Sequence, residues 1–114
     1  MNDLAQMKCV SYQEKEEPLN QKQIDEYKPM VPNWQVVEYS GIHQLERIFS
    51  FNDFNQALSF TMKVGILAEA EAHHPSITTE WGKVTVTWWT HKVKGLHKND
   101  FIMAAKTDVA YNNK

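Results

Sequence analysis

The sequence of 114 residues has little cysteine, glycine or proline: it contains one Cys, four Gly and four Pro. A single cysteine excludes a disulfide within the chain, so packing must stabilise the fold, alone or with help from a second subunit. No stretch approaches the roughly 18 consecutive apolar residues of a membrane-spanning helix. The N-terminus also lacks the basic and apolar stretches of a secretory signal, so we expect a cytoplasmic protein.

Charge of one sign is also scarce, because 12 Lys and Arg oppose 14 Asp and Glu and leave a formal net charge of -2. Non-specific nucleic-acid binding depends on many Lys and Arg contacts with phosphate, so we expect no direct binding of nucleic acid. Hydrophobic residues make up 42% of the chain, which is enough to form a core and argues against intrinsic disorder. The length is that of one domain.

The beginning of the chain is polar and shows no persistent apolar period. We interpret residues 1–18 as a loosely ordered leader and residues 19–114 as the folded domain. A short helix is expected over residues 19–27. Pro29 and Pro32 prevent it from continuing, since proline lacks an N–H donor and restricts the residue before it.

A hairpin and a long helix are expected next. Residues 34–39 and 44–51 have the composition of strands, and the Ser-Gly pair between them fits a tight turn. Asp53 is a helix N-cap candidate, with Gln at the reciprocal capping position three residues later. A helix over residues 54–72 is supported by apolar residues at a spacing of four: Phe54, Leu58, Met62 and Ile66.

The second half repeats the order of two strands and a helix. Residues 77–81 and 84–91 read as strands, and the second alternates between a core face and a semi-polar face that carries Trp89. Asn99 is an N-cap candidate for a closing helix that begins near Phe101. The order predicts an α+β two-layer sandwich, in which a four-stranded antiparallel sheet has helices on one face. Its other face would be free for dimerisation through Trp89.

Three of the five histidines lie where predicted elements end: His73 and His74 at the end of a helix, and His91 at the end of a strand. Glu69 precedes His73 by four residues, so on a helix the two would form an acid/base pair. Asp100 could orient a histidine or a substrate N–H from the start of the closing helix. A plainer interpretation also stands, in which these residues only cap helix ends or face solvent.

Other chemistries have weaker support. Consecutive histidines on a helix point about 100° apart, and the chain has no His-Glu-x-x-His motif, which disfavours a metal site. It has no Gly-x-Ser-x-Gly motif and no glycine-rich phosphate loop either. Proton transfer by imidazoles remains the favoured chemistry.

These residues together resemble the signature of the pterin-4a-carbinolamine dehydratases. The resemblance rests on typed residues at fixed spacings: Glu69, His73, His74, Pro75, Trp81, His91 and Asp100. It extends outward to Trp34 and to residues 51–55, and covers roughly residues 19–111. Residues 76–79 depart from the pattern, because many relatives have an aromatic residue shortly after His-His-Pro, so the rim of the pocket is expected to differ.

The resemblance implies a hydro-lyase that needs no metal and no cofactor. Its reaction would dehydrate 4a-hydroxytetrahydropterins, such as 4a-hydroxytetrahydrobiopterin, to quinonoid dihydropterins, and so recycle the cofactor of hydroxylases such as phenylalanine hydroxylase. His73 and His91 would be the acid/base groups and His74 would chiefly hold the pterin. The resemblance places these further residues around the substrate: Glu69, Pro75, Thr90, Lys92, Val93 and Asp100.

Two further expectations follow from the resemblance. Members of the family share the order of two strands, helix, two strands, helix with an added N-terminal helix, and they associate as homodimers or homotetramers. In animals the same fold also serves as a dimerisation cofactor for a transcription factor. A protein-binding coactivator module is therefore the alternative function.

Overall fold

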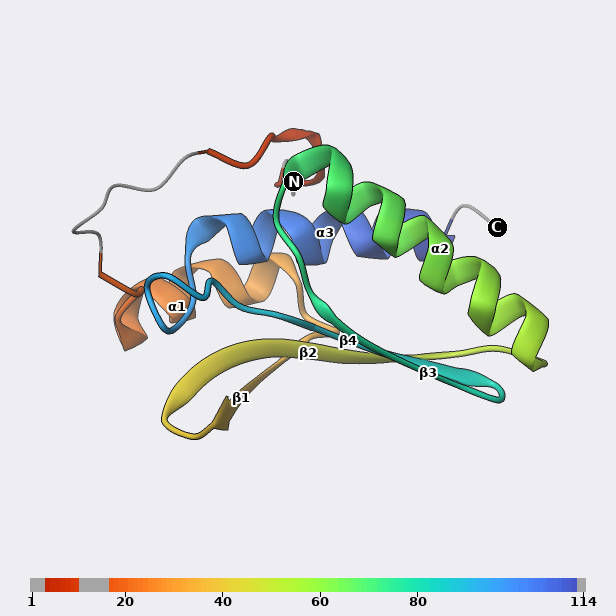
Figure 1. Ribbon diagram of the computed structural model, residues 1–114. Coiled ribbons are helices and arrows are strands. Elements are labelled where there is room, and N and C mark those ends of the chain that lie inside the picture. Colours follow the sequence, from red (N-terminus) through yellow and green to blue (C-terminus); the bar gives the residue numbers. More distant parts are fainter. Residues whose placement is uncertain (1–3, 11–16, 113–114) are drawn as a thin grey trace.

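A four-stranded antiparallel sheet forms one layer of the protein, with strand order β1-β2-β4-β3. In this computed structural model, which describes residues 4–10 and 17–112, the helices lie on one face of the sheet (Figure 1). The predicted two-layer α+β fold is confirmed. The elements are η1 (Leu4–Gln6), α1 (Gln21–Tyr27), η2 (Lys28–Met30), β1 (Gln35–Tyr39), β2 (Ile42–Ser50), α2 (Phe54–Glu71), β3 (Ser76–Glu80), β4 (Lys83–Trp88) and α3 (Lys98–Asn112).

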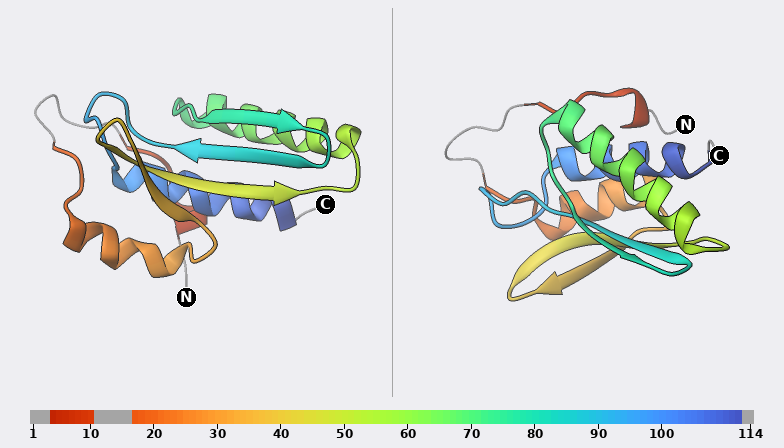
Figure 2. Two further views of the ribbon diagram at one scale, coloured as in Figure 1. Left: turned by 90° about the horizontal axis from the view of Figure 1, so that it is seen from below. Right: turned by 45° about the vertical axis from the view of Figure 1, so that its right-hand side comes forward.

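Two tight hairpins set the register of the sheet. Ser40 and Gly41 link β1 to β2 and both have positive φ angles, 54° and 79°, which gives a two-residue turn the twist that suits a hairpin. β3 and β4 turn through Trp81 and Gly82, so β3 ends one residue before, and β4 begins one residue before, the strand bounds expected from the sequence. β2 and β4 pair in the centre, so the two hairpins form one continuous sheet (Figure 2).

α2 begins as predicted and ends abruptly. The Asp53 side chain accepts from the Gln56 N–H at 2.8 Å, and the Gln56 side chain accepts in turn from the Asn52 N–H. The helix ends at Glu71 because Ala72 adopts a left-handed conformation, with φ 54° and ψ 38°. His73 and the residues after it therefore leave the helix and do not follow its geometry.

The face of α2 that packs on the sheet is not the stripe that best predicted the helix. Its buried residues are Ala57, Phe60, Val64 and Ala68. The four apolar residues at spacing four instead face outward, with exposed fractions of 44%, 45%, 58% and 65%: Phe54, Leu58, Met62 and Ile66. We call these four residues the outer stripe of α2. They leave an apolar ridge on the surface of this chain.

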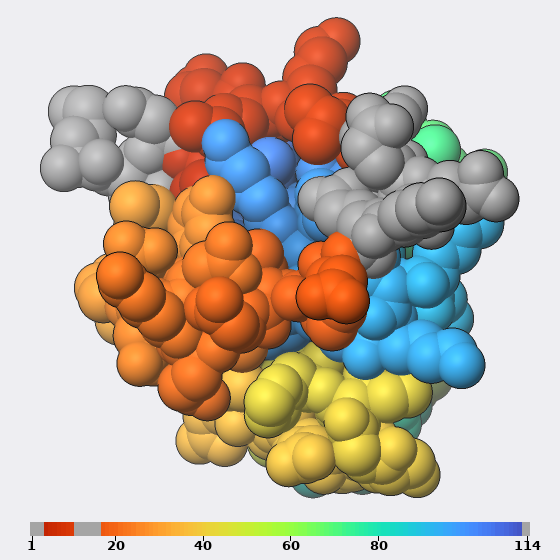
Figure 3. All heavy atoms as spheres, turned by 90° about the vertical axis from the view of Figure 1, so that its left-hand side faces the viewer, coloured from red at the N-terminus to blue at the C-terminus, as the bar shows by residue number. Residues whose placement is uncertain are grey.

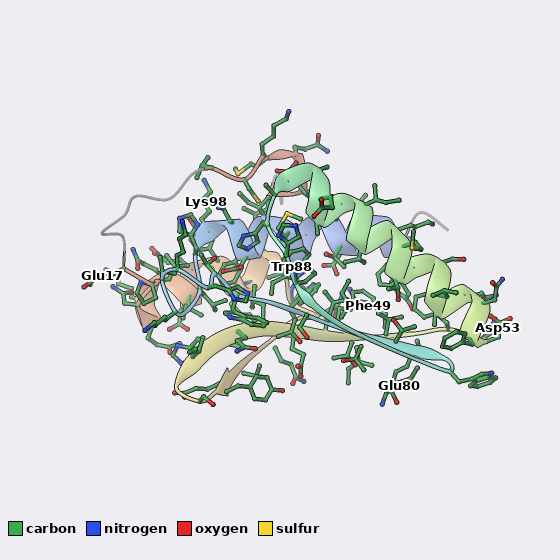
Figure 4. The ribbon with its side chains drawn as sticks, viewed as in Figure 1. Glu17, Phe49, Asp53, Glu80, Trp88 and Lys98 are labelled. Carbon is green, nitrogen blue, oxygen red and sulfur yellow. The ribbon has the colours of Figure 1, made fainter. Side chains whose placement is uncertain are left out.

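Aromatic side chains fill the space between the two layers. Phe49 contacts the rings of Trp34, Phe60 and Tyr111, with centroids 4.7–5.9 Å apart. The Arg47 guanidinium lies over the Phe49 ring, 4.5 Å from its centroid. Figure 4 shows Phe49 and Trp88 between the sheet and the helices, and Asp53 and Lys98 at opposite ends of the molecule. No helix among the described residues is long and apolar enough to cross a membrane.

Part of the expected leader packs on the domain. Leu4 is 2% exposed and belongs to the core cluster, and the Lys106 ammonium donates to the Ala5 carbonyl oxygen at 3.0 Å. We call residues 4–10 the leader segment. It runs beside α3 (Figure 3), so this part of the chain is not loose as expected, while residues 11–16 lie outside the described residues.

Burial on α2 gives a direct stability prediction. Val64→Ala should lower the free energy of unfolding by about 2–3 kcal/mol, because the side chain is fully buried between α2 and the rest of the core. Val109→Ala on α3 is the matched control, since Val109 is 45% exposed, and it should change that free energy by about 0.5 kcal/mol or less. Urea unfolding followed by circular dichroism measures both. Equal losses would contradict the assignment of buried faces.

Candidate active site

The ends of three secondary-structure elements lie close together: the end of α2, the end of β4 and the start of α3. α2 and α3 run in opposite directions across the sheet, so the end of one lies near the start of the other (Figure 1). β4 ends at Trp88 beneath them (Figure 4). His73 follows α2, Thr90 and His91 follow β4, and Asp100 lies in the first turn of α3.

Asp100 is fully buried and joins these three segments through its carboxylate. One oxygen, Oδ1, lies 2.6 Å from His73 Nε2. The other, Oδ2, accepts from the Thr90 hydroxyl at 2.8 Å and from the His97 N–H at 2.9 Å. A buried carboxylate needs such donors, because burial without them would cost several kcal/mol.

The bond to His97 is also a helix cap. The His97 Nδ1 accepts from the Asn99 N–H at 3.0 Å while the His97 N–H donates to Asp100, so the two residues cap the first turn of α3 reciprocally. α3 therefore begins at Lys98, and the expectation that Asn99 is the N-cap is wrong. The Asn99 side chain instead bonds to Val10.

His73 is held on two sides. Its ring stacks on Trp88 with an interplanar angle of 5° and a centroid distance of 5.7 Å. An ionised carboxylate can only accept, so an ionised Asp100 requires a proton on His73 Nε2. In a neutral imidazole of that tautomer Nδ1 keeps its lone pair and is the basic atom.

The predicted pairing of Glu69 with His73 is wrong. The Glu69 carboxylate pairs with His74 Nε2, and both side chains are largely exposed. The left-handed Ala72 explains the exchange, because His73 is no longer on the helix four residues from Glu69. His73 turns inward to Asp100, while His74 stays outside with Glu69.

His91 lies in a turn rather than in a strand. β4 ends at Trp88, and Thr90 and Gly95 then form an isolated bridge that closes a turn over residues 91–94. Trp89 follows the last residue of β4 and is half-buried, and its ring stacks on His91 with centroids 4.5 Å apart. Gly95 has no room for a side chain, since a Cβ there would lie 2.6 Å from Pro18.

Two neighbouring hollows border His73. The first, the histidine hollow, has a volume of about 290 Å³ and is lined by Ala72, His73, His74, Thr90 and His91. The second has a volume of about 320 Å³ and is lined by Cys9, Val10, Glu71, Ala72, His73, Lys92 and Asn99. Ala72 and His73 line both.

The structure thus brings most of the expected site residues together, but not all of them in one place. The three expected catalytic histidines share the histidine hollow, with Asp100 behind His73. Lys92 lines the second hollow. Pro75 and the buried Val93 line neither of the two.

Sequence reasoning missed the residues that come from the leader segment and their partners. Cys9 and Val10 reach the second hollow through long-range bonds to Glu71 and Asn99, which no local pattern indicates. Burial, followed by the negative charge of Glu71, raises the pKa of the Cys9 thiol to about 12. Cys9 is therefore a neutral thiol near pH 7 and not a nucleophile. Among the described residues no group of three or more His, Cys, Asp or Glu side chains is placed to hold a metal ion.

Comparisons with known proteins point to one family. The family model described as pterin 4 alpha carbinolamine dehydratase matches residues 17–110. A protein of Microcystis aeruginosa is 49% identical over 114 residues, covering 100% of this chain and 98% of its own length. One of Chlorobium limicola is 55% identical over 107 residues, covering 94% and 95%. Both are named provisionally as pterin-4-alpha-carbinolamine dehydratases.

Solved structures give the same fold. A Brucella melitensis protein described as a transcriptional coactivator/pterin dehydratase superposes with a TM-score of 0.75 at 30% identity, covering 82% of this chain and 98% of its own. A pterin dehydratase-like protein described as a RuBisCO assembly factor of the alpha-carboxysome superposes with a TM-score of 0.60 at 19% identity, covering 72% and 93%. The second likeness concerns the fold alone.

The two carboxylate–histidine pairs should differ in how much each contributes to the free energy of unfolding. Asp100→Asn should lower the free energy of unfolding by about 1–3 kcal/mol, because the carboxamide NH₂ cannot accept from the buried donors that now bond to a carboxylate oxygen. Glu69→Gln, in the exposed pair, should change it by less than about 1 kcal/mol. Urea unfolding of both variants is the measurement. A larger loss for Glu69→Gln would overturn this account of which pair is structural.

Proposed function

Because the chain belongs to the pterin-4a-carbinolamine dehydratase family, we propose that it dehydrates 4a-hydroxytetrahydropterins to quinonoid dihydropterins. The observation that carries this proposal is the histidine hollow, where His73, His74 and His91 line one cavity and a buried carboxylate supports the first of them. An acid and a base on the walls of one cavity fit a reaction that moves two protons.

The proposed reaction is an elimination of water. The bond between C4a and the hydroxyl oxygen breaks as that oxygen takes a proton from an acid, and water leaves. N5 gives its proton to a base, and its electron pair forms the C4a=N5 double bond. The enzyme returns to its starting state once a proton passes from the base to the acid or through solvent, so no other reactant is needed.

The geometry around His73 supports a division of roles. Its Nε2–H is committed to Asp100, which leaves Nδ1 as the atom that accepts the N5 proton. We assign the acid to His91, across the same hollow, where it protonates the leaving hydroxyl. His74, paired with Glu69 at the rim, binds the pterin ring rather than moving a proton.

The reaction would convert the 4a-hydroxylated cofactor left by hydroxylases of aromatic amino acids into a quinonoid dihydropterin. A separate reductase must then reduce that product before the cofactor is used again. We therefore place the protein in the cytoplasm beside such a hydroxylase, with phenylalanine hydroxylase as the expected functional partner.

Removal of either proton-transfer group should abolish most of the activity. His73→Ala and His91→Ala should each lower kcat for dehydration of synthetic 4a-hydroxytetrahydropterin by about 100-fold or more, the usual contribution of an acid or base. A stopped-flow assay that follows absorbance of the quinonoid product measures this. His43→Ala, on β2 away from the hollow, is the control and should leave the rate unchanged. Full activity in a variant that lacks both His73 and His91 would contradict the proposal.

The outer stripe of α2 supports self-association as a homodimer or homotetramer. Phe54, Leu58, Met62 and Ile66 form an exposed apolar ridge along one helix, and such ridges are stabilised by burial against a partner. A second candidate function, a protein-binding coactivator module, is favoured by this same ridge and by the Brucella melitensis relative's description. In that role the histidines would be dispensable and the ridge would not.

Charge on the outer stripe tests the association. A variant with Leu58→Lys and Ile66→Lys should shift the protein from an oligomer to a monomer, because four buried ammonium groups or more would meet at a symmetric helix interface. Analytical ultracentrifugation measures the mass. Gln21→Lys, at an exposed polar position on α1, adds charge away from the stripe and should leave the oligomer intact. A wild-type monomer, or a double variant with wild-type mass, would rule out this interface.

A further inference from the structure

The leader segment forms one wall of the second hollow, beside the proposed catalytic base. Cys9 and Val10 line this hollow together with residues from α2, from the turn after β4 and from α3, and His73 is among them. In Figure 3 the red surface of the leader segment lies against the blue surface of α3. A segment that begins the chain therefore borders the site that later residues build.

Specific hydrogen bonds hold this wall in place. The Asn99 side chain accepts from the Val10 N–H at 2.9 Å and donates to the Val10 carbonyl oxygen at 2.7 Å, so it binds the backbone of Val10 as a neighbouring strand would. The Cys9 N–H donates to the Glu71 carboxylate at 2.8 Å. Asn99 is 2% exposed, and all three bonds are partly buried. They fix the backbone of the leader segment at the end of α2.

The two hollows adjoin at Ala72 and His73. Each has a volume near 300 Å³, which is at the lower limit of small-molecule pockets, and both include Ala72 and His73. Lys92 of the second hollow directly follows His91 of the histidine hollow. A flat bicyclic ring bound against the histidines would extend its substituent into the second hollow.

The lining of the second hollow suits a substituent that forms hydrogen bonds. Glu71 and Asn99 contribute a carboxylate and a carboxamide, and Lys92 contributes an ammonium group. Cys9 contributes an uncharged thiol, and Val10, which is 58% exposed, is the apolar residue of the lining that lies next to solvent. Neutral hydroxyl groups can donate to the carboxylate and accept from the other two groups.

We propose that the second hollow binds the substituent at C6 of the pterin ring, and that the leader segment thereby selects pterins with a short hydroxylated substituent. This inference rests on the proposed function and deepens it. Val10 is then a specificity-determining residue, while Asn99 and Glu71 are positioning residues that hold it. The family model begins after the leader segment, so this wall is an addition to the part of the chain that the model matches.

The test compares two pterins that differ only at C6, one with a methyl group and one with a dihydroxypropyl group. Val10→Trp narrows the hollow and should weaken binding of the dihydroxypropyl pterin by about tenfold, while binding of the methyl pterin stays within about twofold. Lys8→Trp is the matched control, because Lys8 is exposed on the same segment and does not line the hollow. Quenching of pterin fluorescence gives each Kd with the full-length protein.

The outcomes separate this inference from the proposed function. Weaker binding of the dihydroxypropyl pterin alone supports the inference. A second, smaller change, Val10→Phe, is measured beside Val10→Trp. The circular dichroism spectra of both variants must match that of the wild type. Equal weakening for both pterins, or no weakening for either, overturns the C6 assignment while leaving the dehydratase proposal in place. Wild-type protein that binds neither pterin overturns both. In steady-state assays the same variants should raise KM for the dihydroxypropyl substrate more than KM for the methyl substrate.

Discussion

The buried Asp100 carboxylate joins the end of α2 and the segment after β4 to the start of its own helix, α3. His73, Thr90 and His97 each bring a donor from a different segment, and the carboxylate accepts from all of them. A buried charge in this position destabilises any arrangement in which one donor moves away. The same bonds that close the fold at this end therefore fix the orientation of the His73 ring. Stability and chemistry depend here on one group, and the histidine hollow takes its shape from it.

The backbone at the end of α2 determines which histidine is buried and which is exposed. The left-handed Ala72 separates two adjacent histidines, so that His73 turns to the buried carboxylate and His74 to the exposed Glu69. A continuous helix would have placed both rings on its surface. One backbone residue thus creates a rigid inner imidazole and an outer one beside solvent, as our assignment of a base and a pterin-binding group requires. The leader segment, bonded at the same helix end, adds a wall to the other side of His73.

Much of the fold follows from local signals in the sequence. Alternation, the Asp53 cap and the Ser-Gly turn define elements that pair and pack with their neighbours, and the structure confirms the resulting architecture. The buried face of α2 could not be predicted in the same way, because both of its faces carry apolar residues at helical spacing. The partners of the histidines depend on the φ angle of Ala72. The place of the leader segment depends on Asn99, some 89 residues away from Val10, and no local pattern encodes such a contact.

We infer that Asp100 fixes His73 as the tautomer with its proton on Nε2 and its lone pair on Nδ1. Long-range ¹H–¹⁵N correlation NMR of the imidazole rings at neutral pH measures this tautomer directly. We expect a protonated Nε2 and an unprotonated Nδ1 for His73 in the free protein. A proton on Nδ1 with Nε2 as the acceptor would contradict it, because His73 would then have no base to offer the pterin.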